Sequence, residues 1–593
     1  MLSGILNWSA RARRAAPSLA EGVAALKQGD FQTAMAALRP LAAAGNPEAQ
    51  RHVGLMYAQG QGVFQDFGEA GYWLRRAAEQ GDAEAQHSLS HYLSSGEGAS
   101  HDGRLQMRWY SRARKNHENT AEENRRLFFP HGMGIEKNLD EAFEWCRKAA
   151  EQGHPGAQSD LALMYATGQG VERDIQEAII LFKQAAANNN PVAQYNLGSL
   201  HLKGEELPKD EDEAAAWYRK AAEQGHLASQ IALAMLFRNK SSSPQDMAES
   251  AFWWSKAAEQ NDIRAIYEYA RILSLGLGVE QNKRAAQRWW LKAAEKNHAP
   301  SQLQLAKLLL SGDLGTPDVG EAVAWLRKAG AAGHLPAQLL LAQMFESGIE
   351  TPADPVEAAE WWRKAAEAGD LGAQLRMAQL YREGRGMPKS PQGVAEWLLK
   401  AAEQGEANAQ FAYSVLAANG TGIPKNEGAA EHWCRRAAEQ GHAEAQYTLG
   451  VVYAVGRYGR RDIEEAKAWH RRAAEQNYIA SQINLGIIYI QNANGKEDYD
   501  NSVYWFKKAA AAGDITAMVN LGLIYMQADN IDCDLKESYR WFSLAASLTS
   551  EGSEKLKILD QAAVVAKLLS AEELKEAANL AESWRNDYLR PAA

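Results

Sequence analysis

The sequence predicts an all-α solenoid of about fourteen helix-turn-helix repeats, each 36 residues long. Three columns of residues recur at this period: an alanine in the phrase AAEQG, a tryptophan four residues before it, and a glycine or asparagine four residues after it. The phrase WLRRAAEQGDAEAQ at 73–86 returns as WCRRAAEQGHAEAQ at 433–446. A fixed period of about 20 to 50 residues indicates a stacked array of repeats.

The tryptophan and alanine columns predict one buried helix face in each repeat. Trp73 precedes Ala77, and Trp433 precedes Ala437, each by four residues. Residues four apart share one face of an α-helix. We therefore expect the indole to fill the space between helices while the alanine lets a neighbouring helix approach. Truncating a buried tryptophan of this column to alanine would cost roughly 3–5 kcal/mol.

Further columns predict where this helix begins and ends. Aspartate or another capping residue, such as Asp66, Asp246 or Asp498, recurs at the predicted helix start. A glutamate such as Glu69 follows it by three residues, which is the spacing of a capping box. Glycine or asparagine, such as Asn189, stands at the stop and favours the left-handed conformation. A second helix completes each repeat, as in AEAQHSLSHYLSSG at 83–96.

The repeats divide the chain into three predicted regions. Residues 1–17 are expected to form an N-terminal arm without a secretory signal, because the basic residues follow the broken apolar stretch and do not precede it. Residues 18–552 form the solenoid, since two short helices bury their apolar faces only by stacking. Residues 553–593 are expected to form a C-terminal helical cap, with Ser570 and Glu573 in a capping box.

Composition narrows the classes of function. The formal net charge of −10 argues against binding to nucleic acids or anionic membranes, which needs positive charge facing the phosphates. No apolar run is long enough to span a bilayer. Cys146, Cys434 and Cys533 are far apart, so they predict neither a disulfide framework nor a CxxC metal pair. Cys146 and Cys434 each follow a repeat tryptophan and are expected to be packed thiols.

Taken together, the columns resemble the Sel-one-like repeat, a relative of the tetratricopeptide repeat. The pattern WxRKAAEQGxxxAQxxLGxxYxxGxGVxxDxxEA covers about residues 41–552. The resemblance implies a right-handed alpha-solenoid superhelix and a non-enzymatic scaffold or adaptor for protein–protein contacts. The ending at 541–584 is similar to that of bacterial members. One secreted branch of the family carries paired cysteines that this chain lacks, which favours the cytoplasm.

One copy of the repeat, at 113–148, departs from the pattern. It carries Arg125, Arg126, Phe128 and Phe129 where the second helix is expected, and Pro130 interrupts the helix end. This copy is either a bend or docking notch, or simple drift in a tolerant array.

No catalytic constellation is apparent in the sequence. Neither a GxxxxGK[ST] phosphate loop nor a GxSxG elbow occurs. His87 and His91 share a helix face, but a zinc site needs at least one more ligand. A histidine follows the helix stop in five copies and is expected to be a solvated turn residue: His154, His226, His298, His334 and His442. We therefore predict no catalytic residues, no cofactor and no metal.

A variable column predicts a partner-binding groove. In tetratricopeptide-like stacks the first helix of each pair lines the concave face, and the position two residues after the Leu of the Leu-Gly pair would be exposed there. A structural column would hold one residue type, whereas this one is polar or basic in the middle and apolar towards the C-terminus. Packing in the core is the alternative interpretation. The candidate groove residues are Arg238, Arg264, Arg271, Lys307, Gln343, Arg376, Gln379, Arg382, Val451, Ile487, Ile490, Leu523 and Met526.

The sequence therefore favours a non-enzymatic scaffold that binds segments of one or more proteins, with neither nucleic-acid partner nor membrane span. An RNA-binding helical array is an alternative that the acidic balance opposes. A hydrolase carried on the repeat surface is another, but it would need clustered nucleophile and base residues that the sequence does not show. Homo-oligomerisation through an end or through the apolar third stays open.

Overall fold

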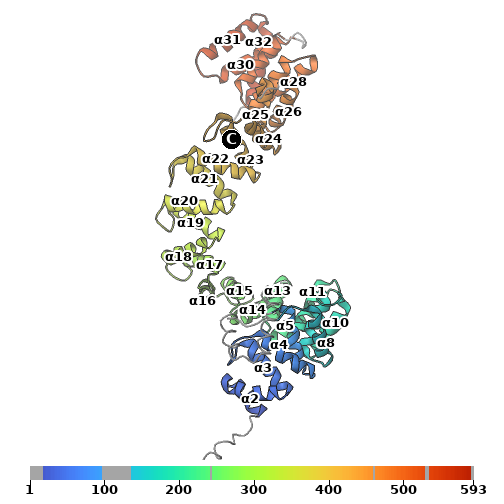
Figure 1. Cartoon of the computed structure of the whole chain (residues 1–593). Coiled ribbons are helices and arrows are strands. Elements are labelled where there is room, and N and C mark those ends of the chain that lie inside the picture. The colour runs from blue at the N-terminus through green and yellow to red at the C-terminus, as the bar shows by residue number, and fades with distance from the viewer. Residues whose placement is uncertain (1–17, 97–134, 241–242, 458–460, 528–532, 589–593) are drawn as a thin grey trace, which may run out of the picture. The chain divides into compact units, whose positions relative to one another are not determined.

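The predicted all-α repeat architecture is confirmed. The computed structural model in Figure 1 describes residues 18–96, 135–240, 243–457, 461–527 and 533–588, and all regular structure within these ranges is helical. The chain divides into two compact units, Met1–Ala293 and Ala294–Ala593, each of which is considered by itself. The predicted arm at 1–17 lies outside the described residues, as does the proposed docking notch around Arg125 and Phe129.

The first unit contains α1 (Leu19–Lys27), α2 (Phe31–Ala43), α3 (Pro47–Gln59), α4 (Phe67–Glu79), α5 (Ala83–Ser95), α8 (Leu139–Glu151), α9 (Pro155–Thr167), α10 (Ile175–Ala187), α11 (Pro191–Lys203), α12 (Glu211–Glu223), α13 (Leu227–Lys240), α14 (Pro244–Glu259), α15 (Ile263–Leu275) and α16 (Lys283–Ala294), which ends at the division.

The second unit contains α17 (Ala299–Leu310), α18 (Val319–Ala331), α19 (Leu335–Ser347), α20 (Pro355–Glu367), α21 (Leu371–Glu383), α22 (Pro391–Glu403), α23 (Ala407–Asn419), α24 (Glu427–Glu439), α25 (Ala443–Val455), α26 (Ile463–Glu475), α27 (Ile479–Gln491), α28 (Lys496–Ala511), α29 (Ile515–Gln527), α30 (Leu535–Leu548), α31 (Ser553–Ala566) and α32 (Ala571–Tyr588).

Each repeat is a pair of helices, here called helix A and helix B. Helix A packs on its own helix B, as α3 does on α4, and helix B packs on helix A of the next repeat, as α4 does on α5. Neither helix of about thirteen residues buries its apolar face alone, so the apolar residues of successive pairs pack together, as in the core cluster that runs from Leu74 to Leu197.

Helix B is bounded as predicted in most repeats. Asp66 caps α4 by accepting a hydrogen bond from the backbone N–H of Glu69 at 3.0 Å. After the C-cap residue, Gly81 (φ 93°) and Asn189 (φ 63°) adopt the left-handed conformation, which other residues adopt only at a cost. This reversal lets the chain enter the next helix A after a turn of only a few residues.

Two predicted caps are wrong. Helix α14 begins at Pro244 after the Ser243 cap, so Asp246 lies within its first turn. Helix α28 begins at Lys496, which places Asp498 within its first turn as well. Proline carries a fixed φ and is favoured in the first helical turn, which explains the earlier start of α14.

The tryptophan column is buried or half-buried, and the glutamate column serves it. In five of the described B helices, the glutamate carboxylate accepts a hydrogen bond from the indole N–H four residues later. These pairs are Glu141–Trp145 (3.2 Å), Glu249–Trp253 (3.1 Å), Glu321–Trp325 (3.1 Å), Glu357–Trp361 (3.2 Å) and Glu537–Trp541 (3.0 Å). Since a buried indole N–H needs a partner, this contact gives the glutamate a role in these five repeats, which the capping-box interpretation missed. The buried indole nitrogens of Trp73 and Trp469 do not form it. Full capping boxes form at Ser18–Glu21 and, as predicted, at Ser570–Glu573.

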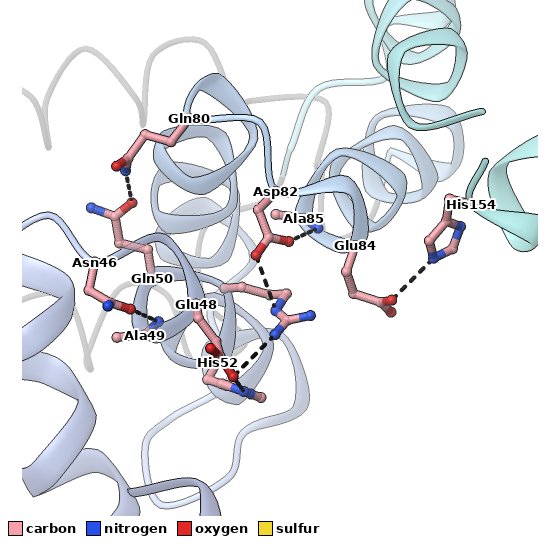
Figure 2. Close-up of polar contacts among 11 residues, drawn as sticks. Asn46, Glu48, Ala49, Gln50, His52, Gln80, Asp82, Glu84, Ala85 and His154 are labelled. Atoms are coloured by element: carbon pink, nitrogen blue, oxygen red, sulfur yellow. Dashed lines mark hydrogen bonds and ion pairs between the residues drawn. The ribbon is translucent and has the colours of Figure 1, made fainter. Parts of the chain in front are cut away.

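A buried glutamine on helix A joins three successive helices. The amide N–H of Gln50 in α3 donates to the carbonyl oxygen of Ala42 at the end of α2 (3.0 Å). Its Oε1 accepts from Nε2 of Gln80, which caps the C-terminus of α4 (2.7 Å; Figure 2). Gln50 is fully buried. Equivalent links recur along both units, as in Gln224–Gln194 and Gln404–Gln374, both 2.8 Å.

In three repeats of the second unit, the glutamine of helix A lacks the second bond of this link, the one that its Oε1 would accept from the end of its own helix B. Gln302, Gln338 and Gln482 each donate to the preceding helix, but their buried Oε1 atoms have no hydrogen-bond partner. The residue 30 positions later, which is Gln404 for Gln374, is alanine in all three cases: Ala332, Ala368 and Ala512. An unpaired buried acceptor costs roughly 1–3 kcal/mol, so these repeats are less stable than they could be.

The stack passes directly from α5 to α8. These helices pack as α3 packs on α4. The Asn138 N–H donates to the Leu93 carbonyl at 3.0 Å, whereas the equivalent bond elsewhere joins residues nine apart, such as Asp66 and Tyr57. The separation of 45 residues exceeds nine by 36, one full repeat.

The C-terminal helices α31 and α32 both pack on α30. The rings of Trp541 and Trp584 meet edge to face at 5.0 Å, which joins α32 to the last repeat tryptophan. Leu556 and Leu568 remain exposed on this segment. The segment therefore covers one side of the last repeat and keeps apolar side chains on its outer surface.

Restoring the missing link should stabilise the second unit. We expect Ala332→Gln to donate to Gln302 Oε1 and to raise the free energy of unfolding by about 1 kcal/mol, measured by urea denaturation followed by circular dichroism. Ala331→Gln, at the neighbouring exposed position, is the control and should change little. Equal effects of the two substitutions would contradict the link.

The junction between α5 and α8 can be tested by a disulfide. A Cβ placed on Gly96 lies 3.0 Å from the Cβ of Lys137, and Gly96 has a φ of 68°. A disulfide needs a Cβ–Cβ distance of about 3.5–4.5 Å, so the bridge requires a small shift of this loop. In a Cys533→Ser background, we expect Gly96→Cys with Lys137→Cys to oxidise to an intramolecular disulfide, identified by peptide mapping. The pair Gly168→Cys with Lys137→Cys should stay reduced. Reduced thiols in both pairs would show that α5 and α8 are not neighbours.

Candidate functional site

All thirteen candidate groove residues lie on A helices, and none is fully buried. Their exposure separates them into two groups. Arg264, Lys307, Gln343 and Arg382 are exposed, and the other nine are half-buried. The A-helix surface therefore carries these side chains, but the structure does not gather them into one cluster. The three arginines up to Arg271 belong to the first unit and the remaining ten residues to the second.

In the first unit the candidate cations have internal partners. The guanidinium of Arg238 lies 3.5 Å from the Glu268 carboxylate, and Arg271 lies 3.0 Å from the same group. Arg264 donates to the sulfur of Met235 at 3.3 Å. The contacts of Arg238 and Arg264 link α13 to α15, and the one carboxylate of Glu268 offsets part of the positive charge of Arg238 and Arg271.

In the second unit, some of the polar candidates have a side-chain partner and others do not. Arg376 in α21 forms a two-pronged ion pair with Glu346 in α19, in which its Nε lies 3.2 Å from Glu346 Oε2. Gln379 donates to Glu383 at 2.6 Å. Lys307 and Arg382, in contrast, form no hydrogen bond or ion pair with another described residue. These two cations remain available to a partner.

Arg382 and Gln379 line the same cavity, which has a volume of about 300 Å³ and opens to solvent. Its apolar wall comes from three helices: Leu375 and Ala378 of α21, Val394 and Leu398 of α22, and Ala409 and Ala412 of α23. Glu406 and Asn408 complete the rim at the start of α23. An apolar hollow with a few polar groups at its edge is the usual form of a binding site.

The apolar candidates near the C-terminus contribute to packing as well as to the surface. Ile487, Ile490, Leu523 and Met526 are half-buried against the core cluster that contains Phe506 and Phe542. Val451 is half-buried on α25. These residues therefore combine the two interpretations of the column, because each keeps part of its side chain exposed while the rest packs in the core.

The prediction that the five histidines after the helix stop are solvated turn residues is wrong. They stand at the start of the A helices instead. Nδ1 of His154 accepts from the backbone N–H of Ala157 at 3.1 Å, and His442 caps α25 in the same way. His154 also contacts Glu84 of α5 at 3.1 Å (Figure 2). All five are half-buried, and burial lowers the pKa of His226, His298 and His334.

This second cap column was missed by the sequence interpretation. Asn46 and Asp82 occupy it in other repeats and cap α3 and α5 through the N–H groups of Ala49 and Ala85 (Figure 2). The signal was present, because Asn, Asp and His recur one residue after most of the left-handed stops, with Glu406 and Tyr478 as the described exceptions. The helix start was not assigned there because only helix B had been given a cap.

The thiols of Cys146 and Cys434 and the imidazole of His87 form contacts within the helix stack. The Sγ atoms of Cys146 and Cys434 contact carbonyl oxygens at 3.3 and 3.5 Å, and burial raises the pKa of each thiol to about 12. Both are packed thiols, as predicted. His87 bonds to Asp160 at 2.8 Å, and within the described ranges no group of three or more His, Cys, Asp or Glu side chains is arranged to hold a metal ion.

A family model described as Sel1 repeat matches the chain along most of its length. The matched segments are residues 47–82, 83–116, 129–154, 155–190, 191–226, 227–262, 263–298, 299–334, 335–370, 372–406, 407–442, 443–478, 479–514 and 515–550. The match at 83–116 joins α5 to residues outside the described part, whereas the structure pairs α5 with α8.

Two solved bacterial structures are similar. A protective antigen present in uropathogenic Escherichia coli strains, displaying an SLR fold, is 26% identical; the match covers 94% of this chain and 97% of that one, with a TM-score of 0.48. A Sel1 repeat protein from Oxalobacter formigenes is 29% identical; the match covers 54% of this chain and 91% of that one, with a TM-score of 0.37. No curated protein sequence matches the chain.

Among the buried histidines, His470 should make the second unit sensitive to acid. Burial lowers its pKa from 6.5 to about 4. Between these values the unfolded chain binds a proton that the folded chain does not, so stability falls as the pH falls. The loss across this window approaches about 3 kcal/mol, at 1.36 kcal/mol per pH unit. Urea denaturation at several pH values measures it.

A matched variant isolates this contribution. The next repeat carries Phe506 and Ala517 where this one carries His470 and Ser481, and Gly486 faces Phe506 as Gly450 faces His470. His470→Phe with Ser481→Ala should flatten the slope of stability against pH, whereas His432→Phe, at an exposed position, should leave it. A slope that persists in the double variant would assign the acid sensitivity to other groups.

Proposed function

Because the chain belongs to the Sel1 repeat family, we propose that it is a non-enzymatic scaffold or adaptor that binds segments of partner proteins along its A helices. The repeat architecture supports protein interaction in general, since stacked helical pairs present a long surface on a continuous core. The thirteen candidate groove residues are the proposed contact positions.

The observation that carries this proposal is the contrast between two columns of the same helices. The column of Gln374 and Gln410 is buried and holds glutamine in every described repeat except those with Ile266 and Met518, and its glutamines link neighbouring helices. The column of Lys307, Gln343 and Val415 changes from repeat to repeat, and its described members are exposed or half-buried, none fully buried. Since packing does not explain such variation, a surface adapted to a particular partner does.

The alternatives receive less support. An RNA-binding array needs a basic surface, but the formal net charge is −10 and Arg238, Arg271 and Arg376 are paired with glutamates. A hydrolase needs a nucleophile beside a base. The buried cysteines have strongly raised thiol pKa values, and His87 and His154 are bonded to carboxylates.

The compartment is proposed from the cysteines. Cys146 and Cys434 are buried in separate cores and Cys533 is a free thiol, which fits a reducing compartment such as the cytoplasm. No helix in the described ranges has the length and apolar character needed to cross a bilayer. We therefore propose protein partners that share this compartment.

Site-specific photocrosslinking tests the function. A photoreactive amino acid at Gln343, on helix A, should form covalent adducts with a partner protein in cells. The same amino acid at Arg363, exposed on helix B, is the matched control and should give few adducts. Mass spectrometry then identifies the crosslinked segment.

The opposite pattern would overturn the proposal. Adducts at Arg363 without adducts at Gln343 would place the interaction on the B helices. A sequence-specific RNA recovered at Gln343, or a turnover activity that survives substitution of all contact positions, would favour one of the alternative functions.

A further inference from the structure

We propose that the cavity between α21, α22 and α23 binds a partner segment in which a large apolar side chain lies close to an aspartate or glutamate. This inference deepens the proposed function by naming the chemistry of one docking point. The apolar side chain fills the cavity, and the carboxylate forms an ion pair with Arg382.

The argument starts from pairs of positions that face each other on successive A helices. A residue on one helix A can meet the residue 30 positions later on the next helix A. On the A-helix surface one such pair of positions is Arg238 and Glu268, whose charged groups lie 3.5 Å apart. Three repeats later the same pair of positions holds Glu346 and Arg376, which form the two-pronged ion pair. The positions therefore accommodate opposite charges in either order.

The next repeat has only half of such a pair. Arg382 stands where Glu346 stands one repeat earlier, and Ala412 stands where Arg376 does. Both residues line the cavity. Replacing a long charged side chain by alanine leaves the space open and leaves the Arg382 guanidinium without its expected carboxylate.

The acidic side chains nearby are engaged elsewhere. Glu383 accepts a hydrogen bond from Gln379 at 2.6 Å. Glu406 caps the start of α23, where it accepts from the backbone N–H of Ala409 and from Asn408 at 2.7 Å. The helix terminus offsets the charge of Glu406. Arg382 is therefore the unpaired ionic group of the cavity, and its complement is an anion.

The shape and lining define the rest of the ligand. The wall formed by Leu375, Val394, Leu398 and Ala412 is apolar, and the volume of about 300 Å³ accommodates one large aliphatic or aromatic side chain with part of its backbone. Because Arg382 is at the same cavity, the carboxylate must be near that side chain in sequence. Arginine pairs with carboxylates through two parallel hydrogen bonds, which would reproduce the geometry of Glu346 and Arg376.

The decisive variant is Ala412→Glu, because it supplies the missing half of the pair from within the protein. The precedent of Arg238 and Glu268 indicates that the fold tolerates this arrangement. We expect the variant to fold normally by circular dichroism and to lose affinity for the ligand by about tenfold or more, the effect of one such ion pair. Thr448→Glu, the same position one repeat later, is the matched control.

The probe is a randomised short-peptide library panned on the full-length chain, with affinities of enriched peptides measured by fluorescence anisotropy. Enriched peptides should pair a large apolar residue with Asp or Glu, bind Thr448→Glu as they bind the unmodified chain, and weaken with Ala412→Glu and with added salt. Peptides that bind Ala412→Glu equally well, or that lack an acidic residue, would overturn this inference and leave the scaffold function in place. Recovery of no peptide would overturn it too, and photocrosslinking at Gln343 would then decide the scaffold function separately.

Discussion

The structure depends on the buried glutamine of helix A. A side-chain amide has both a donor and an acceptor, so Gln50 can close the end of the preceding helix B through its N–H and receive the C-cap of its own helix B through its oxygen. In a buried site both bonds are strong and an unpaired group is costly. The link therefore holds the relative position of three helices, and both of its bonds recur at other glutamines such as Gln86 and Gln446.

A second constraint acts between the helices of one pair. Gly198, Gly486 and Gly522 on A helices each face a ring of the adjoining helix B, namely Tyr218, Phe506 and Phe542, so closely that an added Cβ would lie within 2.8 Å of it. A glycine opposite an aromatic ring conserves volume at the crossing. This contact and the glutamine link recur in several repeats, so the packing between helices A and B is similar in them. The outward positions of helix A take no part in these two contacts and can vary.

The candidate site follows from that constant geometry. Since particular positions 30 residues apart face each other on successive A helices, a change at one of them alters a local contact and leaves the stack intact. Two such pairs of positions form ion pairs, Arg238 with Glu268 and Glu346 with Arg376. At the equivalent pair Arg382 and Ala412, no ion pair forms and a cavity remains. Both glutamine links around this cavity, Gln404–Gln374 and Gln440–Gln410, are complete. The helices around the cavity are therefore held by complete glutamine links, which suits a preformed docking point.

From the sequence alone, the repeat period, the all-α class, the left-handed stops at residues such as Gly81, and most caps of helix B could be predicted, because each depends on a few residues close together in the chain. The thirteen surface candidates could be placed on helix A for the same reason. The tertiary structure decided which side chains meet: the glutamate and the indole within helix B, the two partners of Gln50, the helices α5 and α8, and the residues around the cavity beside Arg382. The first of these contacts depends on the side-chain conformation, and most of the others join residues 30 or more positions apart. Local periodicity therefore does not show which partner is present and which is missing.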